Sequence, residues 1–329
     1  MPFQLLLDEQ DLLRCRFAVS PLWETQEAVR TLDRPRRHGY HLPWLRRIRE
    51  AAAGLDLRPL WTLMPDGGHN PDFFCPMPRG PVASFEEEIA RVRATPAEAA
   101  LTDIGAALDS VPGGRGSPAG RELLADPART VRRTADLLEQ AWHVLVEPEW
   151  PRLCALLEAD VAYHSRRLAE GGFAQVVGEL SPRLVWEEST LTISGMRGDH
   201  TRVLGGAGLV LMPSVFCWPD VISGYEPPWQ PAVIYPVRGI GGLWTRPTGR
   251  TPAALGALLG RVRADVLCAL DEPAGTSVLA RRLSLAPSTV SAHLSVLREA
   301  GLLTSRRYGH QVLYERTPLG TTLAASPED

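Results

Sequence analysis

The sequence predicts an α+β protein: a large, mostly helical N-terminal domain with a small antiparallel sheet, then a smaller domain of short helices and a β-hairpin. Three observations lead to this class. Apolar residues recur with helical period from Arg121 to Glu170. Short β-prone runs separated by turn residues follow within residues 183–237. A glycine-bearing stretch, 239–251, then precedes new helical patterns, so we expect domains at 1–245 and 246–329.

Composition narrows the class of protein further. With 329 residues, 44% of them hydrophobic and 22% charged, the chain is an ordinary globular protein with room for two or three domains. Asp8, Glu9 and Asp11 interrupt the only early apolar run, and no stretch reaches the roughly 18 apolar residues of a membrane helix. We therefore expect a cytoplasmic protein with no membrane partner. Five scattered cysteines argue against a disulfide framework and indicate free thiols.

The N-terminal domain is expected to be irregular in places. Ser20 followed by Pro21 is a helix start signal, and Gly54 ends a later helix. Residues 111–120, VPGGRGSPAG, are expected to form a flexible break. We expect a strand passing into a helix at residues 3–17 and two further helices within residues 20–54. A proline-rich loop follows at residues 64–81, and one or two helices at residues 84–109.

The C-terminal domain carries the clearest local pattern. A short helix is expected from Ser277 to Leu283, and a second one from Pro287 to Ala300. In the second, apolar residues recur at i, i+4 and i+7, and Gly301 stops it. Two β-prone runs, LLTSRR and QVLYER, then meet across a turn at residues 308–310. Two helices joined by a short turn and followed by a hairpin form a winged helix-turn-helix.

The exposed side of this motif suits double-stranded DNA. Because the second helix buries Val290, Leu294 and Leu297, short polar side chains near its N-terminus face outward, where a major groove presents base edges. Two arginines precede the wing turn, within reach of phosphates. From residue 276 to 316, six arginines and two glutamates give a net charge of +4, against −3 for the whole chain. The candidate DNA-contacting residues are Ser288, Thr289, Ser291, Ala292, Arg306, Arg307 and His310.

The run LARRLSLAPSTVSAHLSVLREAGLL, with TSRRYGHQVLYERTPLG behind it, resembles the DNA-reading half and wing of ArsR-family bacterial repressors. The resemblance covers residues 255–323 and implies a dimeric regulator that binds an operator. Two positions depart from the family: Ser284 replaces the usual turn glycine, and Ala286 replaces the usual serine or threonine cap. The segments SPLWE, PDFFCP and LMPSVFCWP, within residues 3–245, resemble an uncharacterised domain that is fused to such winged helices in actinobacteria.

Dimerisation has its own sequence signal. The helix expected at 252–270 carries six apolar residues at helical spacing, more apolar surface than one small domain can cover: Leu255, Leu258, Leu259, Val262, Val266 and Leu270. This pattern predicts a homodimer, although the N-terminal domain could cover the same surface instead.

Metal sensing and catalysis find little support. The resemblance implies that metal-responsive relatives carry thiols in the first helix or an Asp/His set in the last, but the segments here are LARRLS and TPLGTTLAA. His38 with His41, and His69 near Cys75, do not assemble the three or four ligands of a zinc site. No GxSxG, GxxxxGK[ST] or HExxH motif occurs. We expect no metal, no cofactor and no enzymatic activity.

Small-molecule sensing is the remaining role for about 240 further residues. Tryptophans line apolar pockets well, although their usual place is the core. The sequence therefore predicts a DNA-binding transcriptional regulator, a repressor, whose N-terminal domain senses a small apolar or aromatic effector. A constitutive DNA-binding protein with an N-terminal dimerisation domain, or an enzyme with a DNA-binding tail, are the alternatives. The candidate effector-binding residues are Trp44, Trp61, Trp142, Trp186 and Trp218.

Overall fold

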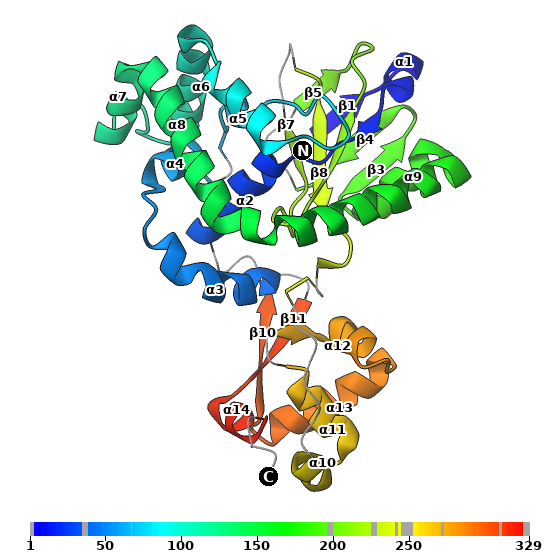
Figure 1. The fold of residues 1–329 in the computed structure, drawn as a ribbon. Helices are drawn as coiled ribbons and strands as arrows, with labels where there is room; N and C mark the ends of the chain where they lie inside the picture. The colour runs from blue at the N-terminus through cyan, green and yellow to red at the C-terminus, as the bar shows by residue number, and fades with distance from the viewer. Residues whose placement is uncertain are drawn as a thin grey trace. The chain divides into compact units, whose positions relative to one another are not determined.

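The computed structural model describes residues 3–34, 39–66, 68–195, 200–224, 229–240, 243–244, 253–270, 273–308 and 311–324. The chain forms two compact units, drawn in Figure 1. Unit 1 comprises Met1–Asp33 and Ile48–Arg238, and unit 2 comprises Arg34–Arg47 and Gly239–Asp329. The predicted α+β class, with a mostly helical N-terminal region and a C-terminal winged helix, is confirmed.

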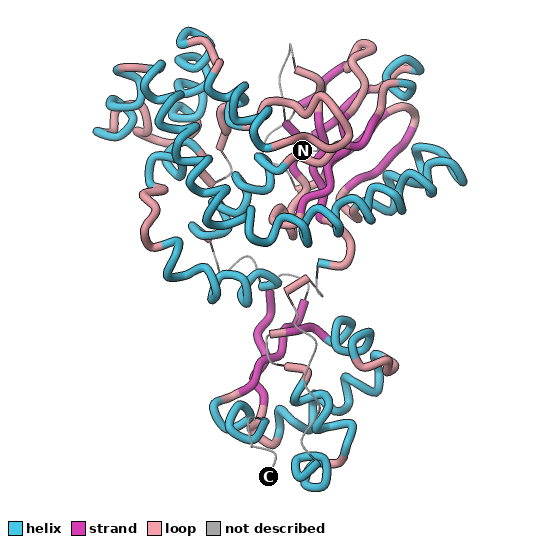
Figure 2. Tube along the Cα trace, viewed as in Figure 1, coloured by secondary structure: helices cyan, strands magenta, loops and turns pink. Residues whose placement is uncertain are grey.

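Unit 1 is built from a group of helices beside two small sheets. In Figure 2 the helices from α4 to α8 lie together on one side of the unit and the strands on the other. Trp142–Val146 is a π-helical turn and Glu147–Glu149 a 3₁₀ turn, and together they lead into the longest helix. The helices are α1 (Glu9–Leu13), α2 (Pro21–Asp33), α4 (Arg58–Leu63), α5 (Phe85–Arg93), α6 (Ala97–Asp109), α7 (Pro118–Ala125), α8 (Pro127–Ala141) and α9 (Trp150–Leu180).

Helix α2 is the most buried helix of unit 1 and follows the predicted start signal. The Ser20 hydroxyl accepts a hydrogen bond from the Trp23 backbone N–H at 2.9 Å, and Pro21 occupies the first helical position. Ten of its thirteen residues are buried, among them Glu24 and Glu27. The helix is therefore surrounded by protein on all sides, as an all-round buried sequence requires.

Helix α9 is interrupted where the sequence placed a glycine pair. Gly172 adopts φ +74°, which is outside the helical region, and the helix then resumes as far as Leu180.

The segment 111–120, which was expected to be a flexible break, also has a defined structure. There, Gly114 N–H donates to Val111 O at 2.9 Å and Ser117 N–H to Gly114 O at 3.2 Å, so residues 110–117 form consecutive hydrogen-bonded turns between α6 and α7.

The strands of unit 1 form two mixed sheets, which corrects the expectation of one antiparallel sheet. In the first, β3 (Leu184–Glu187), β4 (Thr190–Ile193), β1 (Phe3–Leu6) and β5 (His200–Val203) lie in that order, and β1 pairs with β5 in parallel. In the second, the order is β2 (Arg16–Phe17), β6 (Val210–Ser214), β8 (Ala232–Pro236) and β7 (Ile222–Gly224), and β2, β6 and β8 are parallel.

Burial explains why the pairing differs from the expectation. Every residue of β6 is buried, and so are four of the five residues of β8. Strands covered on both faces read as continuous apolar runs and are typical of parallel sheets, whereas antiparallel sheets usually show alternation. Leu5, Leu191, Leu211 and Val233 share one core with the end of α9 between these sheets.

The glycine-rich run 205–208 connects β5 of one sheet to β6 of the other and is not a hairpin turn.

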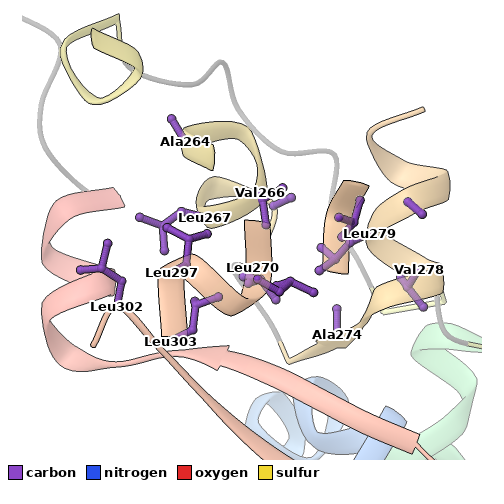
Figure 3. Packing of buried hydrophobic residues seen from close by; sticks show 14 of the residues in the cluster. Ala264, Val266, Leu267, Leu270, Ala274, Val278, Leu279, Leu297, Leu302 and Leu303 are labelled. Carbon is purple, nitrogen blue, oxygen red and sulfur yellow. The ribbon is translucent and has the colours of Figure 1, made fainter. Parts of the chain in front are cut away.

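Unit 2 contains the winged helix. Gly260 adopts φ +81° and divides the single helix expected at 252–270 into α10 (Ala253–Leu259) and α11 (Arg261–Cys268). The other elements are β9 (Ala274–Gly275), α12 (Thr276–Arg282), α13 (Pro287–Glu299), β10 (Leu303–Tyr308), β11 (Gln311–Arg316) and α14 (Pro318–Ala324). Strands β10, β11 and β9 form an antiparallel sheet. Figure 3 shows Val266, Leu267, Leu279, Leu297 and Leu303 packed in its core.

Unit 2 also takes in a segment from the first fifth of the chain. The 3₁₀ turn Gly39–His41 and the first half of α3 (Leu42–Ala52) belong to it, and the last residues of α3 belong to unit 1. Among the described residues, no helix is both long enough and apolar enough to span a bilayer.

Two buried carboxyl groups flank the start of α2. Glu24 is fully buried and accepts a hydrogen bond from Val215 N–H at 3.1 Å, and burial raises its pKa to about 8. Glu88 on α5 accepts from the Ser20 hydroxyl at 2.9 Å and from Leu22 N–H at 3.1 Å, and burial likewise raises its pKa to about 8. Desolvation outweighs these hydrogen bonds, so both groups are largely protonated at neutral pH.

We predict that the free energy of unfolding falls as the pH rises from 4.5 to about 8 and levels off above that pH. A folded-state pKa raised from 4.5 to about 8 gives stability that is complete below pH 4.5 and is lost as the pH passes 8. Glu24→Gln and Glu88→Gln should each flatten this loss, measured as urea unfolding free energy against pH. Glu86→Gln, an exposed neighbour on α5, is the matched control and should keep the wild-type slope. Equal slopes in all four proteins would contradict the assignment.

Candidate nucleic-acid interface

The exposed face of α13 is set by the residues it buries. Val290, Leu294 and Leu297 lie in the core of unit 2 with at most 1% of their surface exposed. Since these positions occupy one side of the helix, the first turns present the other side to solvent. The structure places four of the predicted contact residues together on this exposed face: Ser288, Thr289, Ser291 and Ala292.

The turn before α13 shows the consequence of the two unusual residues. Ser284 adopts φ +54°, the left-handed conformation that favours glycine. Ala286 is the N-cap, with extended backbone (φ −67°, ψ 141°) and no side-chain hydrogen bond to the first turn. Pro287 at the first helical position preorganises the helix start. The turn therefore adopts the left-handed backbone that glycine favours, although Ser284 is not glycine. The N-cap residue Ala286 likewise lacks a side chain that could accept a hydrogen bond from the first turn.

The wing is a regular hairpin whose tip lies outside the described residues. Arg306 pairs in register with Leu313, and Arg307 with Val312, and both arginines are exposed. Arg306 Nε lies 3.7 Å from Glu315 Oε1 on the neighbouring strand. The predicted contact residue His310 falls within the undescribed tip. The wing thus carries two exposed arginines at adjacent positions of β10, with the Glu315 carboxylate beside Arg306.

Two of the six arginines counted in the sequence hold the fold together. Arg282 donates to the carbonyl of Ala269, and Arg316 donates to Leu267 O at 2.8 Å and Cys268 O at 2.5 Å. These carbonyls end helix α11, where a positive charge also opposes the negative end of the helix dipole. The arginines that remain exposed are Arg281, Arg298, Arg306 and Arg307.

An open pocket of about 390 Å³ adjoins the start of α13. Ser277, Ala280 and Arg281 of α12 line it, with Leu285 and Pro287 from the turn. Backbone N–H groups at a helix N-terminus and a nearby guanidinium are the two features that bind a phosphate. In the sequence, Arg281 contributes to the local positive charge but has no predicted contact, because only the packing of α12 against α13 brings it to this position.

The segment Gly39–Arg47 packs inside unit 2 around Trp244. Trp44 and Trp244 stack with ring centroids 6.0 Å apart, and both side chains are fully buried. Trp244 Nε1 donates to His41 Nδ1 at 3.0 Å, and the Arg47 guanidinium lies 5.3 Å from the Trp244 ring.

The same segment reaches the wing. Arg46 Nη2 lies 3.4 Å from Glu315 Oε2, so the carboxylate that faces Arg306 also faces an arginine of α3. Nothing in the local sequence pattern of residues 39–47 indicates this partner, because the two segments lie about 270 positions apart along the chain.

The predicted effector-binding tryptophans are packed with different partners. Trp44 belongs to unit 2 and stacks on Trp244, and Trp142 stacks on Phe85 at 4.6 Å. Trp186 meets Phe173 edge-on at 5.0 Å, and Trp61 Nε1 donates to Val29 O at 3.0 Å. Trp218 is half-buried after β6. Trp44 and Trp142 are thus buried in aromatic packing, whereas Trp61, Trp186 and Trp218 are half-buried.

The described residues contain no cluster of potential metal-ligand side chains. No cluster of three or more His, Cys, Asp or Glu side chains there is placed to hold a metal ion. The five cysteines are free thiols, two of them buried.

Comparison with known protein families agrees with this geometry. Residues 246–306 match a helix-turn-helix domain family, and residues 113–241 match a family of unknown function, DUF5937. No curated protein and no solved structure matches the chain. The chain therefore carries a C-terminal helix-turn-helix domain behind a region that matches a family of unknown function, and the helix-turn-helix domain makes it a DNA-binding transcriptional regulator.

We predict that Ala286→Ser stabilises the C-terminal unit by about 1 kcal/mol. The N-cap backbone is already extended, so a serine hydroxyl there can accept a hydrogen bond from an unpaired N–H of the first turn. The measurement is the unfolding free energy of the full chain, followed with a probe placed in unit 2. Ala300→Ser, at the other end of α13, is the control and should give no gain. An unchanged stability in Ala286→Ser would show that the cap geometry is wrong.

Proposed function

We propose that the protein is a transcriptional repressor that binds a two-fold symmetric operator as a homodimer, and that its N-terminal domain adjusts this binding in response to a small molecule. The observation that supports DNA contact best is the exposed polar face of α13 beside a wing with two exposed arginines. A recognition helix and a wing on one small domain are the parts that read a major groove and hold its edge.

The contact residues divide by role. Ser288, Thr289 and Ser291 lie at the N-terminal end of α13, where they reach base edges in the major groove, and Ala292 supplies an apolar contact for a thymine methyl. Arg306 and Arg307 bind phosphates from the wing, and His310, which lies outside the described residues, remains a candidate contact from the sequence. Arg281 and the first-turn N–H groups of α13 bind a further phosphate at the adjoining pocket.

The homodimer rests on a smaller surface than the sequence suggested. Leu255, Val266 and Leu270 are buried in the core of unit 2 itself. Leu258 of α10 is 70% exposed, and Leu319 of α14 is 56% exposed. Among the exposed large apolar residues described in unit 2, these two have the largest exposed fractions, and we propose that a second copy covers them. An inverted repeat in the bound DNA would reflect the same two-fold symmetry.

Helix α3 supports a link between the N-terminal domain and the wing. Its first half packs in unit 2, where Arg46 contacts Glu315, and its last residues belong to unit 1. A helix is stiff over this length, so a small molecule that changes unit 1 can alter the position of Arg46 relative to the wing. In the alternative function, a constitutive DNA-binding protein, the N-terminal domain would only assemble the dimer.

The wing arginines give the sharpest test of DNA binding. Arg306→Ala with Arg307→Ala should weaken binding to operator and random DNA alike. Because each phosphate contact contributes about 0.9 to the slope of log affinity against log salt, the slope should become about 2 shallower. The operator is obtained first by in-vitro selection of bound DNA, and fluorescence anisotropy then gives the slope. Arg129→Ala with Arg132→Ala, two exposed arginines of α8, removes the same charge and should leave the slope unchanged. An unaltered slope in the wing variant would exclude the wing from the interface.

The contact between α3 and the wing gives a second prediction. Arg46→Ala, Glu315→Gln and the double variant form a cycle measured on operator affinity. An exposed ion pair contributes about 0.2–1 kcal/mol, so each single variant should change the affinity by up to about fivefold, and the two effects should not add. Arg49→Ala, an exposed arginine on the same helix, serves as the control. Additive effects, or none, would mean that α3 does not act on the wing.

A further inference from the structure

Unit 1 has an open pocket of about 640 Å³ at the amino-terminal ends of its parallel strands. Its lining comes from three segments, each at or just before the start of a strand. The segment at β2 contributes Leu13, Arg14, Cys15 and Arg16, the segment before β6 contributes Ala207, and the segment before β8 contributes Gln230. Because β2, β6 and β8 run in parallel, their starts lie at one edge of the sheet, and segments from three distant parts of the chain meet there.

Among the described residues, the two arginines of this pocket donate hydrogen bonds to neutral acceptors alone. Arg14 Nη1 donates to Gly206 O at 2.5 Å, and Arg16 Nη2 donates to Pro78 O at 2.5 Å and Gln230 Oε1 at 3.2 Å. Within the described part of the chain, neither guanidinium has a carboxylate at ion-pair distance, and Arg16 Nη1 is buried without a hydrogen-bond partner. In contrast, Arg93 and Arg167 each pair with two carboxylates.

A partly buried cation without a counter-ion is unfavourable. Removing a charged group from water costs free energy unless an opposite charge or hydrogen bonds replace the lost hydration. Burial lowers the pKa of Arg16, which reflects this penalty. Asp11, the nearest acid in sequence, is already engaged, since its carboxylate accepts from Gly208 N–H at 2.9 Å and Asp8 N–H at 3.0 Å. An anion entering the pocket would supply the missing charge.

The remaining wall of the pocket is apolar or uncharged. Leu13 and Ala207 present hydrocarbon, and burial raises the pKa of the Cys15 thiol to about 11, so it stays neutral. The loop beside it is closely fitted: Gly208 adopts φ +73°, and a Cβ there would lie 2.5 Å from Arg14 Cβ. An anion with an apolar body matches this mixture better than a bare inorganic ion does.

The opposite edge of the same sheet is closed by the protein itself. Small molecules in parallel sheets usually bind beyond the carboxyl ends of the strands. Here the chain beyond β6 donates Val215 N–H to the carboxyl group of Glu24, which is fully buried at that edge. The place where a ligand is usually found is therefore occupied, and the open pocket lies at the other end.

We propose that this pocket binds a small organic anion, with its carboxylate between the guanidinium groups of Arg14 and Arg16 and its apolar body against Leu13, Cys15 and Ala207. A planar guanidinium binds a carboxylate through two parallel hydrogen bonds, which fixes the orientation of the ligand. The binding claim stands alone, and only its role as the effector site rests on the proposed function.

Titration calorimetry of the full chain tests the site. The probes are benzoate, its neutral counterpart benzamide, acetate and inorganic phosphate. Benzoate should bind at least tenfold more tightly than benzamide, because the amide lacks the charge, and more tightly than acetate or phosphate, which lack the apolar body. Equal binding of benzoate and benzamide, or no binding of any anion up to about 10 mM, would overturn the proposal.

Variants locate the binding. Arg14→Gln and Arg16→Gln should each weaken benzoate at least tenfold, while Arg129→Gln on α8 should bind as the wild type does. Arg14 is exposed, so Arg14→Gln keeps the test decisive if Arg16→Gln fails to fold. Wild-type affinity in folded Arg14→Gln would place the anion elsewhere and refute the site.

Operator affinity measured with and without benzoate separates the two proposals. If benzoate binds and changes the operator affinity, the result supports both the pocket and its role as the effector site. Binding with unchanged operator affinity retains the pocket and removes it as the effector site. Failure of benzoate, acetate and phosphate to bind refutes the pocket and leaves DNA binding by α13 and the wing untouched.

Discussion

Burial of Val290, Leu294 and Leu297 is the interaction on which the proposed DNA-binding surface of α13 depends. These side chains fix the rotation of α13 about its own axis, and that rotation decides which residues face outward. A change of one position in the apolar pattern would turn Ser288, Thr289 and Ser291 away from solvent. The core of unit 2 thus sets the orientation of α13 and also stabilises the unit.

Arginine serves two purposes around that core. Arg282 and Arg316 bind the carbonyls that end α11, whereas Arg306 and Arg307 stand exposed on the wing. The guanidinium group suits both roles, since it donates in a fixed plane and keeps its charge at every physiological pH. Net charge by itself therefore overstates the surface available to DNA, because part of the charge is used within the fold.

Unit 1 combines an apolar parallel sheet with two buried carboxyl groups. Glu24 and Glu88 are buried around the first turn of α2, and each has a pKa raised by desolvation. Such groups lower stability when they must ionise. They nevertheless accept hydrogen bonds from buried backbone N–H groups, Glu24 from Val215 just after β6 and Glu88 from Leu22 in the first turn of α2. The carboxyl edge of the sheet is closed in this way, which leaves the amino edge, with Arg14 and Arg16, as the open one.

Local features of the sequence were sufficient for the winged helix. The helical period of residues 287–300, the stop at Gly301 and the hairpin of β10 and β11 depend on neighbours within a few positions, and the structure places them as expected. Fold class and the exposed face of α13 belong to this group. Only the resemblance to ArsR-family repressors marked Ser284 as standing in the place of a glycine, and the structure shows its left-handed backbone, with φ +54°.

Only the tertiary structure decided the features that depend on distant segments. Whether β6 and β8 run parallel depends on which chain lies beside which, and an apolar run alone does not specify that. The sequence likewise could not show that Gly39–Arg47 joins unit 2, that Trp44 and Trp142 are packed side chains, or that Arg14 and Arg16 share a pocket with Gln230. The physical reason is common to all of them: periodicity reports the environment of a residue along one element, whereas pairing and pockets are set by packing between elements far apart in the chain.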